Sequence, residues 1–262
     1  MMNRRTALRG LLAAPALART AGLKLSTFAV DVTPPLGAPL CFSLVEPVKS
    51  VAAPLWAKGV ALYPESQLPI VLVAVDWLGI GGASYRDWQS KLAAALRTTP
   101  DRVAIHTVHQ HDAPGSYRDA HARLAPLGLG AQLAPEAFCS AAVDRVAAAL
   151  RAAPSQSVNA IGWGQARVEG IASNRRIVGP DGKFLFQRFT TCRNSEYCQA
   201  PDGVIDSYLR TVSFHGDKKR LATLHYYATH PMSLYGQGHV SGDFVGDARE
   251  ALPGFHVYFT GA

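Results

Sequence analysis

Two histidines separated by one residue are the strongest sign of chemistry in this 262-residue chain. His109 and His111 follow the apolar run 103–108 and precede Pro114 and Gly115. If the strand continues through them, both side chains project from one face, because strand side chains alternate. Neutral imidazoles are zinc ligands, and a catalytic zinc site takes three protein ligands and leaves one position for water. The pair therefore predicts a metal site, with solvated or core histidines as the alternative interpretation.

A third histidine, His230, stands in the same kind of place. It follows the apolar run 221–227 and is itself followed by Pro231. One such histidine is usually structural. Two histidine sites at the ends of long apolar strands can converge at one sheet edge, where α/β folds assemble their sites. We therefore expect His230 to lie close to His109 in the fold.

Apolar runs of strand length predict the sheets that must carry these histidines. The run 70–75 is apolar enough to be buried on both faces, so it predicts a central strand, which Asp76 ends. Turn residues at 179–182 (GPDG) and 216–219 (GDKK) predict two hairpins. Further strands are expected at 28–32, 59–63, 103–109, 160–163, 166–168 and 256–259.

Two longer stretches have helical periodicity. Residues 84–97 place apolar side chains at helical spacing, and Ser84 with Asp87 predicts a capping box at the start. Residues 135–152 predict a second helix with a proline at its first position, and a short helix is expected at 243–252. Helices mixed with crossover and hairpin connections indicate the α/β class, with mixed β-sheets and flanking helices.

Composition limits the kinds of partner. Hydrophobic residues make up 48% of the chain and charged residues 17%, below the roughly 25% of an average soluble domain. No apolar run reaches the ~18 residues of a membrane-spanning helix. The net charge is +7, but the basic residues are scattered without aromatic residues between them, so nucleic-acid binding is not expected. Contact with an anionic membrane surface is a weaker alternative.

The N-terminus has the pattern of a signal peptide. Arg4 and Arg5 precede the short apolar stretch 11–14, and 16–18 (ALA) has the small residues that a signal peptidase accepts. The paired arginines suggest the twin-arginine route. We therefore expect a signal peptide within residues 1–25, export to the periplasm or the outside of the cell, and a mature domain over 26–262. An amphipathic N-terminal tail is the alternative.

The four cysteines are compatible with an oxidising compartment without requiring one. Cys192 and Cys198 lie in a polar, loop-like segment, where their spacing favours a local disulfide over a zinc site. Cys139 lies on the apolar face of the helix at 135–152, so we expect a buried structural thiol there.

Motifs along nearly the whole mature chain resemble the N-terminal domain of the neutral/alkaline non-lysosomal ceramidases. In that family a Thr-His-Thr-His-Ser-x-Pro-Gly motif stands where this chain has 108–115 (VHQHDAPG). The motifs that carry the resemblance, in order, are 31–37 (DVTPPLG), 75–80 (VDWLGI), 109–115 (HQHDAPG), 173–176 (SNRR), 230–231 (HP) and 241–246 (SGDFVG).

The resemblance implies a role for each matching residue. His109 and His230 would be zinc ligands, His111 would face the substrate near the metal, and Arg175 would bind a polar substrate group or the developing oxyanion. Asp243 would orient His230 or serve as a helix N-terminal residue. The zinc ion (Zn2+) would polarise an amide carbonyl and activate water, which cleaves ceramide or a related N-acyl lipid to a fatty acid and a sphingoid base.

The chain also departs from the family pattern. The family's remaining ligands, a glutamate and a tyrosine, and its Gly-Asp-x-Ser-Pro segment would lie beyond residue 262, so the domain is expected to be incomplete at its C-terminus. Gln110 and Asp112 replace a threonine and a serine. The expected function is a hydrolase of a lipid or another N-acyl compound. One alternative is a ceramidase-like domain without a competent metal site. An unrelated His-x-His barrel metallohydrolase is disfavoured, because there the pair follows the first strand.

Overall fold

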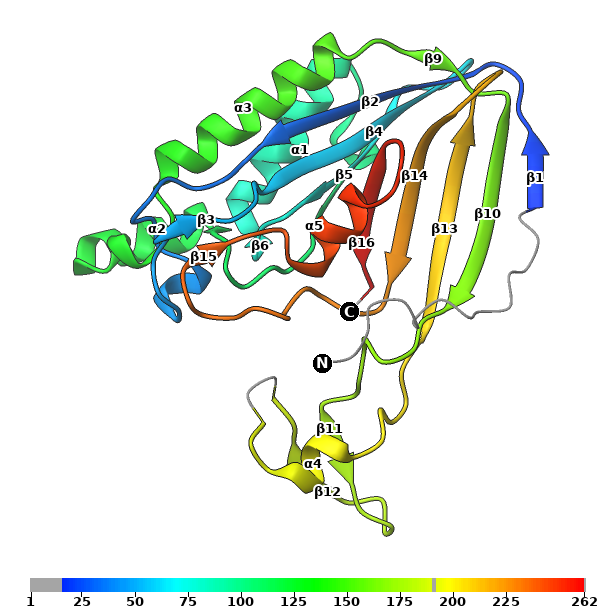
Figure 1. The fold of residues 1–262 in the computed structure, drawn as a ribbon. Coiled ribbons are helices and arrows are strands. Elements are labelled where there is room, and N and C mark those ends of the chain that lie inside the picture. Colours follow the sequence, from blue (N-terminus) through cyan, green and yellow to red (C-terminus); the bar gives the residue numbers. More distant parts are fainter. Residues whose placement is uncertain (1–15, 190–191, 262) are drawn as a thin grey trace.

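The computed structural model describes residues 16–189 and 192–261, which form an α/β structure built on mixed sheets (Figure 1). The expected fold class, α/β with mixed β-sheets and flanking helices, is therefore confirmed. The first large sheet has the order β7-β5-β4-β2-β9 and the second has the order β1-β10-β13-β14-β16. The first consists of β7 (Val103–Thr107), β5 (Ile70–Val75), β4 (Trp56–Pro64), β2 (Leu23–Asp31) and β9 (Gln156–Ser157). The second consists of β1 (Ala16–Arg19), β10 (Ala160–Arg167), β13 (Tyr208–His215), β14 (Arg220–Tyr227) and β16 (His256–Thr260).

Two long helices cover the outer face of the first sheet. Helices α1 (Gly82–Leu96) and α3 (Glu136–Ala152) lie side by side on β2, β4 and β5 (Figure 1). Their apolar faces, with Trp88 and Leu150, pack against β5 side chains such as Val73 in one buried cluster. Cys139 belongs to this cluster, which confirms its prediction as a buried thiol.

The inner face of the first sheet packs on the second sheet. Leu25 of β2, Val60 of β4 and Ala74 of β5 lie in one buried cluster with Leu224 of β14 and Val257 of β16. Because β5 contributes alternate side chains to both clusters, it is buried on both faces, as its uninterrupted apolar run predicts. The molecule thus has a helix layer, the first sheet and the second sheet, in that order.

Both predicted hairpins are confirmed. β13 pairs antiparallel with β14, and β11 (Arg176–Val178) pairs antiparallel with β12 (Phe184–Gln187). The second hairpin and the short helix α4 (Ser195–Gln199) project from the second sheet as a separate lobe (Figure 1). We call this part, together with the flanking Asn174 and Arg175, the lobe.

Shorter elements join the two sheets and hold the loops. The short helix α5 (Asp243–Glu250) precedes β16 and agrees with the prediction at 243–252. Two parallel two-stranded pairs, β3 with β15 and β6 with β8, tie distant loops together. The remaining bounds are β3 (Ser50–Val51), β6 (Gly79–Ile80), β8 (Gly115–Ser116), β15 (His239–Val240) and α2 (Arg118–Leu124), with single 3-10 turns at Cys41–Ser43, Pro100–Arg102, Ala125–Leu127 and Gly130–Gln132.

Two helix starts differ from their predictions. In α3, Pro135 takes the N-cap position before Glu136 instead of the first helical position. Helix α1 begins two residues before Ser84, and Gly81 stands at its N-cap position without a side-chain cap. Ser84 Oγ instead accepts a hydrogen bond from the backbone N–H of Arg118 at 2.9 Å. Asp87 forms ion pairs with Arg118 and Lys91. The predicted capping box is therefore wrong, because tertiary contacts with α2 take both side chains.

The predicted signal peptide falls largely outside the described residues, since Arg4 and Arg5 lie in 1–15. Residues 16–19 form β1, an exposed strand at the edge of the second sheet. The expected domain boundary after residue 25 lies inside β2, where Leu25 is fully buried. A start after Ala18 would keep β2 whole. Within the described residues, no helix is long and apolar enough to span a membrane.

Candidate functional site

Three histidine rings meet at the point where strands of two different sheets end, rather than at one sheet edge. The ring centroids of His109 and His111 lie 4.8 Å apart, and His230 lies 5.1 Å from the first and 5.2 Å from the second. His109 and His111 follow β7 of the first sheet, and His230 follows β14 of the second. The prediction that His230 lies beside the pair is confirmed. We call these three residues the histidine cluster.

The pair reaches this geometry by a turn rather than by an extended strand. β7 ends at Thr107, and His109 has a φ of 63° in the left-handed region, which costs an L-residue about 1–2 kcal/mol. The expectation that the strand continues through both histidines is therefore wrong. A hydrogen bond from His109 N to Trp77 O (3.1 Å) helps to hold the turn. Strain of this kind persists where the surrounding contacts fix it, and it is common at functional sites.

The ring of His109 is held in one tautomer. Its Nδ1 lies 2.8 Å from the carbonyl oxygen of Leu78. A carbonyl only accepts, so Nδ1 must carry a proton, and in the neutral ring Nε2 then carries the lone pair. A backbone carbonyl on the second ring nitrogen is the usual support of a metal-binding histidine.

His111 is positioned by its buried neighbour Gln110. The backbone N–H of His111 donates to Gln110 Oε1 at 2.6 Å, and Gln110 Nε2 donates to Ser241 O at 2.8 Å. The Nδ1 atom of His111 is buried and has no hydrogen-bond partner among the described residues. Burial, followed by the nearby His109 and Arg175, lowers the pKa of His111 to about 4. The ring is therefore neutral at pH 7.

His230 contacts Arg175 of the lobe. Arg175 Nη2 donates to His230 Nε2 and to Met232 Sδ, each at 3.2 Å. Burial, followed by His111, His109 and Arg175, lowers the pKa of His230 to about 4. The imidazole is thus neutral and accepts through Nε2, and Arg175, predicted from the sequence as a site residue, lies at the cluster.

Asp243 does not contact the ring of His230 in the way the resemblance suggests. It is the first residue of α5, and its Oδ2 accepts hydrogen bonds from the backbone N–H groups of Ser233 (2.8 Å) and Leu234 (3.1 Å). The carboxylate therefore holds the loop that follows His230, so its effect on the ring is indirect.

The donor set suits zinc, although its present arrangement is not a finished site. Two or three neutral imidazoles, one with its tautomer fixed, are ligands that zinc prefers. His230 Nε2, however, already accepts from Arg175. Among the described residues, no group of three or more His, Cys, Asp and Glu side chains stands in a metal-holding arrangement. Binding at His109 and His230 thus requires Arg175 to leave Nε2, a movement of one flexible side chain.

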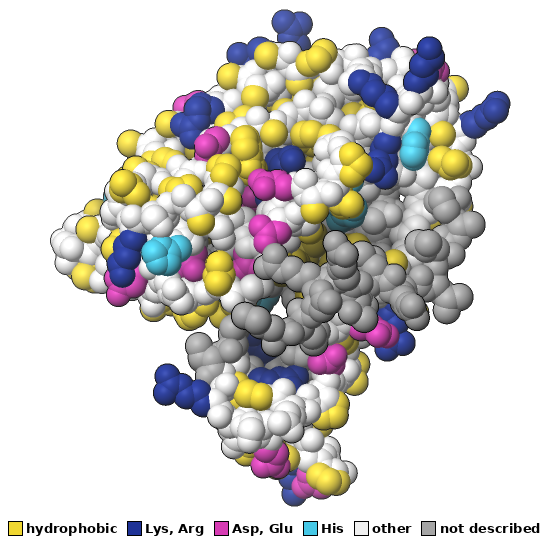
Figure 2. Space-filling view, viewed as in Figure 1, with side chains coloured by type: hydrophobic (Ala, Val, Ile, Leu, Met, Phe, Trp, Pro, Cys, Tyr) yellow, Lys and Arg dark blue, Asp and Glu magenta, His cyan; other side chains and the backbone are white. Residues whose placement is uncertain are grey.

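A cavity of about 530 Å³ opens beside the cluster, between the lobe and the loop that follows β14. His230 lines it on one side, and Arg175 with Arg188 lines it on the lobe side. The cavity has the size of a small-molecule site. On the face of the molecule that Figure 2 shows, Lys and Arg side chains are interspersed with Asp and Glu side chains.

Three site residues were not predicted as such. The Tyr235 ring packs edge-on against His111 at 5.6 Å. Asp112 Oδ1 accepts from Gly236 N at 3.1 Å, which holds the loop that carries Tyr235. Gln110 and Asp112 are the two departures from the family motif, and that mismatch was the available signal. Nothing around Tyr235 in the sequence marks it.

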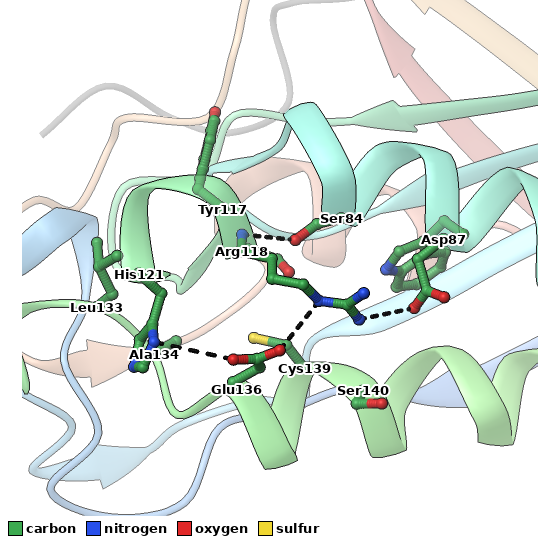
Figure 3. A pocket seen from close by; sticks show the side chains of 12 residues that line it. Ser84, Asp87, Tyr117, Arg118, His121, Leu133, Ala134, Glu136, Cys139 and Ser140 are labelled. Atoms are coloured by element: carbon green, nitrogen blue, oxygen red, sulfur yellow. Dashed lines mark hydrogen bonds and ion pairs between the residues drawn. The ribbon is translucent and has the colours of Figure 1, made fainter. Parts of the chain in front are cut away.

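A second pocket, between α1, α2 and α3, is structural (Figure 3). It holds only about 20 Å³, and Arg118 fills it, with ion pairs to Asp87 (3.2 Å) and Glu136 (3.0 Å). His121 stands 3.8 Å from Glu136 on the same side. This network fixes α2 to the long helices and leaves no room for a ligand.

The two lobe cysteines lie close together as free thiols. Cys198 Sγ donates to the carbonyl oxygen of Cys192 at 3.1 Å, and both are free. The local disulfide remains a prediction that their proximity allows.

Comparison with known proteins adds no family assignment: no protein-family model and no curated protein sequence matches the chain. The residues that bear on function are therefore the histidine cluster, Arg175 and those that line the cavity.

Proposed function

We propose that this chain is a zinc-dependent hydrolase of N-acyl amide bonds, of the neutral/alkaline ceramidase type, exported to the periplasm or the outside of the cell. The observation that supports the proposal most is the convergence of the histidine cluster with Arg175 at the edge of a cavity of about 530 Å³. The substrate would be ceramide, a related lipid or another N-acyl compound. Zinc, when bound, would polarise the amide carbonyl and activate water.

The residues of the site would bind the metal and the substrate. His109 would hold the metal through Nε2, since its Nδ1 proton is committed to Leu78 O. His230 would hold it through the Nε2 that now accepts from Arg175. Once released from His230, Arg175 would hydrogen-bond the substrate. His111, neutral at pH 7, would accept a hydrogen bond from a polar substrate group.

A second candidate is a ceramidase-like domain that does not catalyse. The contact between Arg175 and His230 Nε2 favours it, because the arginine uses the lone pair that a metal would need. A guanidinium also repels a metal ion by like charge. The two candidates differ in metal content, so they can be separated without knowledge of the substrate.

The test is the zinc content of the purified chain by elemental analysis, together with turnover of a fluorogenic N-acyl amide. We expect about one zinc ion per chain with turnover, and loss of that zinc in both His109→Ala and His230→Ala. His121→Ala, which changes a histidine of α2 paired with Glu136, is the matched control and should keep its zinc. Arg175→Gln should also keep it.

Two results would decide against the proposal. If zinc stays in both histidine variants, the two residues do not share a metal site. If the unmodified chain holds little zinc and turns over no amide, the non-catalytic candidate is favoured.

A further inference from the structure

Arg175 carries a charge that no carboxylate in the described structure neutralises. Among the described residues, its Nη2 donates to an imidazole nitrogen and a thioether sulfur, His230 Nε2 and Met232 Sδ. The described ion pairs give Arg249 and Arg210 an acidic partner each, whereas none of them includes Arg175. Partial burial of a cation without a counter-ion costs free energy. Binding of an anion next to Arg175 would offset that cost.

The cavity around Arg175 has no acidic side chain among its described lining residues. Arg188 lines the same space, and its two terminal nitrogens donate to four backbone carbonyl oxygens, of Asn174, Tyr197, Ala200 and Pro201, at 2.7–3.5 Å. Carbonyl groups satisfy the hydrogen bonds of Arg188 but do not cancel its charge. The lobe wall of the cavity therefore presents two guanidinium groups, and Arg175 has N–H donors without a partner among the described residues.

An apolar cavity of about 200 Å³ adjoins the first one. The two share Ile171 and Phe244 in their walls, and the second continues between α5 and the second sheet along Val168, Leu209 and Leu252. Its walls are mainly hydrocarbon, so it suits an alkyl chain. An amphiphile with its charged end at Arg175 and its chain past Phe244 would match both spaces.

We infer that the site selects anionic amphiphiles, specifically N-acyl compounds whose amine part carries a carboxylate, such as N-acyl amino acids, with Arg175 as the specificity-determining residue. A single free guanidinium matches the single charge and the two oxygens of a carboxylate. The binding preference follows from Arg175 and the two cavities, whereas cleavage of the bound compound rests on the proposed function.

The test compares two amides that differ only in the terminal group of the amine part, a carboxylate in one and a hydroxymethyl group in the other. N-dodecanoylglycine and N-dodecanoylethanolamine share the chain and the amide, and only the first is an anion. Isothermal titration calorimetry below the micelle concentration, with metal removed, should give at least about 10-fold tighter binding of the glycine conjugate. Arg175→Gln should abolish that preference and change the affinity for the neutral conjugate less than about 2-fold.

Two further variants control the result. Lys183→Gln removes a positive charge from the same lobe at an exposed side chain paired with Asp181, and it should keep the preference. Arg175→Lys keeps the positive charge but lacks the planar guanidinium group, so this variant should retain part of the preference for the glycine conjugate. The inference is overturned if the unmodified chain binds both conjugates equally, if Lys183→Gln loses as much as Arg175→Gln, or if Arg175→Gln weakens both conjugates alike.

The binding and cleavage results separate the two proposals. Preferential binding of the glycine conjugate without hydrolysis in the presence of zinc would support the specificity and refute the hydrolase. Hydrolysis of both conjugates with equal kcat/KM and equal affinity would support the hydrolase and refute the specificity.

Discussion

Replacing Arg249 by methionine should destabilise the protein more than removal of any surface ion pair. Arg249 of α5 makes two parallel hydrogen bonds to Asp76, at 2.9 and 2.6 Å, and the side chains are 5% and 1% exposed. Asp76 Oδ2 also accepts from Trp56 N at 2.9 Å. In Arg249→Met the buried carboxylate would keep that one hydrogen bond among the described residues, with Lys58 as the remaining cation nearby.

The expected loss is about 3–5 kcal/mol of unfolding free energy, the usual cost of leaving one charge of a buried pair uncompensated. Domains of ordinary stability have only about 5–15 kcal/mol. Asp76→Asn leaves the opposite charge unpaired and should cost a comparable amount. The double variant should cost less than the sum of the two, by about 0.5–3 kcal/mol, because the second change removes the charge that the first one stranded.

Urea denaturation followed by tryptophan fluorescence measures these free energies, and an unchanged m-value would show that the unfolding reaction is the same. Lys183→Gln, which breaks an exposed ion pair with Asp181, should cost no more than about 1 kcal/mol. A loss below about 1 kcal/mol in Arg249→Met, or strict additivity in the double variant, would refute the view that the pair ties α5 to the first sheet.

Two further predictions concern pH and the support of His111. Burial, and then His256, lowers the folded-state pKa of His225 to about 4, against about 6.5 in the unfolded chain, so the unfolded state takes up its proton first as the pH falls. His225 alone should thus lower the unfolding free energy, measured by urea titration, by on the order of 1–3 kcal/mol from pH 6.5 to pH 4. His111 and His230, whose pKa values are also lowered to about 4, should add to the fall, and a flat profile there would contradict the prediction. Gln110→Ala should cost about 1–3 kcal/mol because it strands the buried N–H of His111, whereas Gln165→Ala on the exposed side of β10 should stay within about 0.5 kcal/mol, as thermal or urea unfolding would show.

Local patterns in the sequence were sufficient for most of the large elements. The run at β5 and the turn residues at 179–182 and 216–219 predict a central strand and two hairpins that the structure contains. These features depend on apolar periodicity and turn residues within a short stretch of sequence, so the sequence alone can predict them. The capping box at Ser84 failed for the opposite reason, since α2 supplies a competing partner for its hydroxyl.

The arrangement of the sheets could not be read in this way. β16 pairs in parallel with β14, and β15 pairs with β3 across most of the chain. No turn residue encodes a parallel pairing, because its connection is long and its register is set by packing. The sequence indicates which residues form strands, but not which strands pair across long connections or that β7 and β14 belong to different sheets.

In the site too, features set by neighbouring residues were predictable and contacts between distant segments were not. The spacing of His109 and His111, with the position of His230 after a strand, predicts that the three approach each other. The left-handed turn at His109 and the hydrogen bond to Leu78 O depend on a loop from another part of the chain. The support that fixes the tautomer was therefore beyond sequence reasoning.

Charge connects the two proposals at Arg175. In the present structure the guanidinium rests on His230 Nε2, so a divalent ion at that nitrogen must displace it and would then face a like charge nearby. A carboxylate that pairs with Arg175 draws the arginine away from His230 and offsets its charge, which removes both penalties. Coupling between two ligands is reciprocal, so whatever factor the anion adds to metal affinity, the metal adds to anion affinity. A neutral amide gains nothing from this coupling. The arginine that occupies the metal-binding nitrogen of His230 is therefore also the residue through which an anionic substrate would favour metal binding.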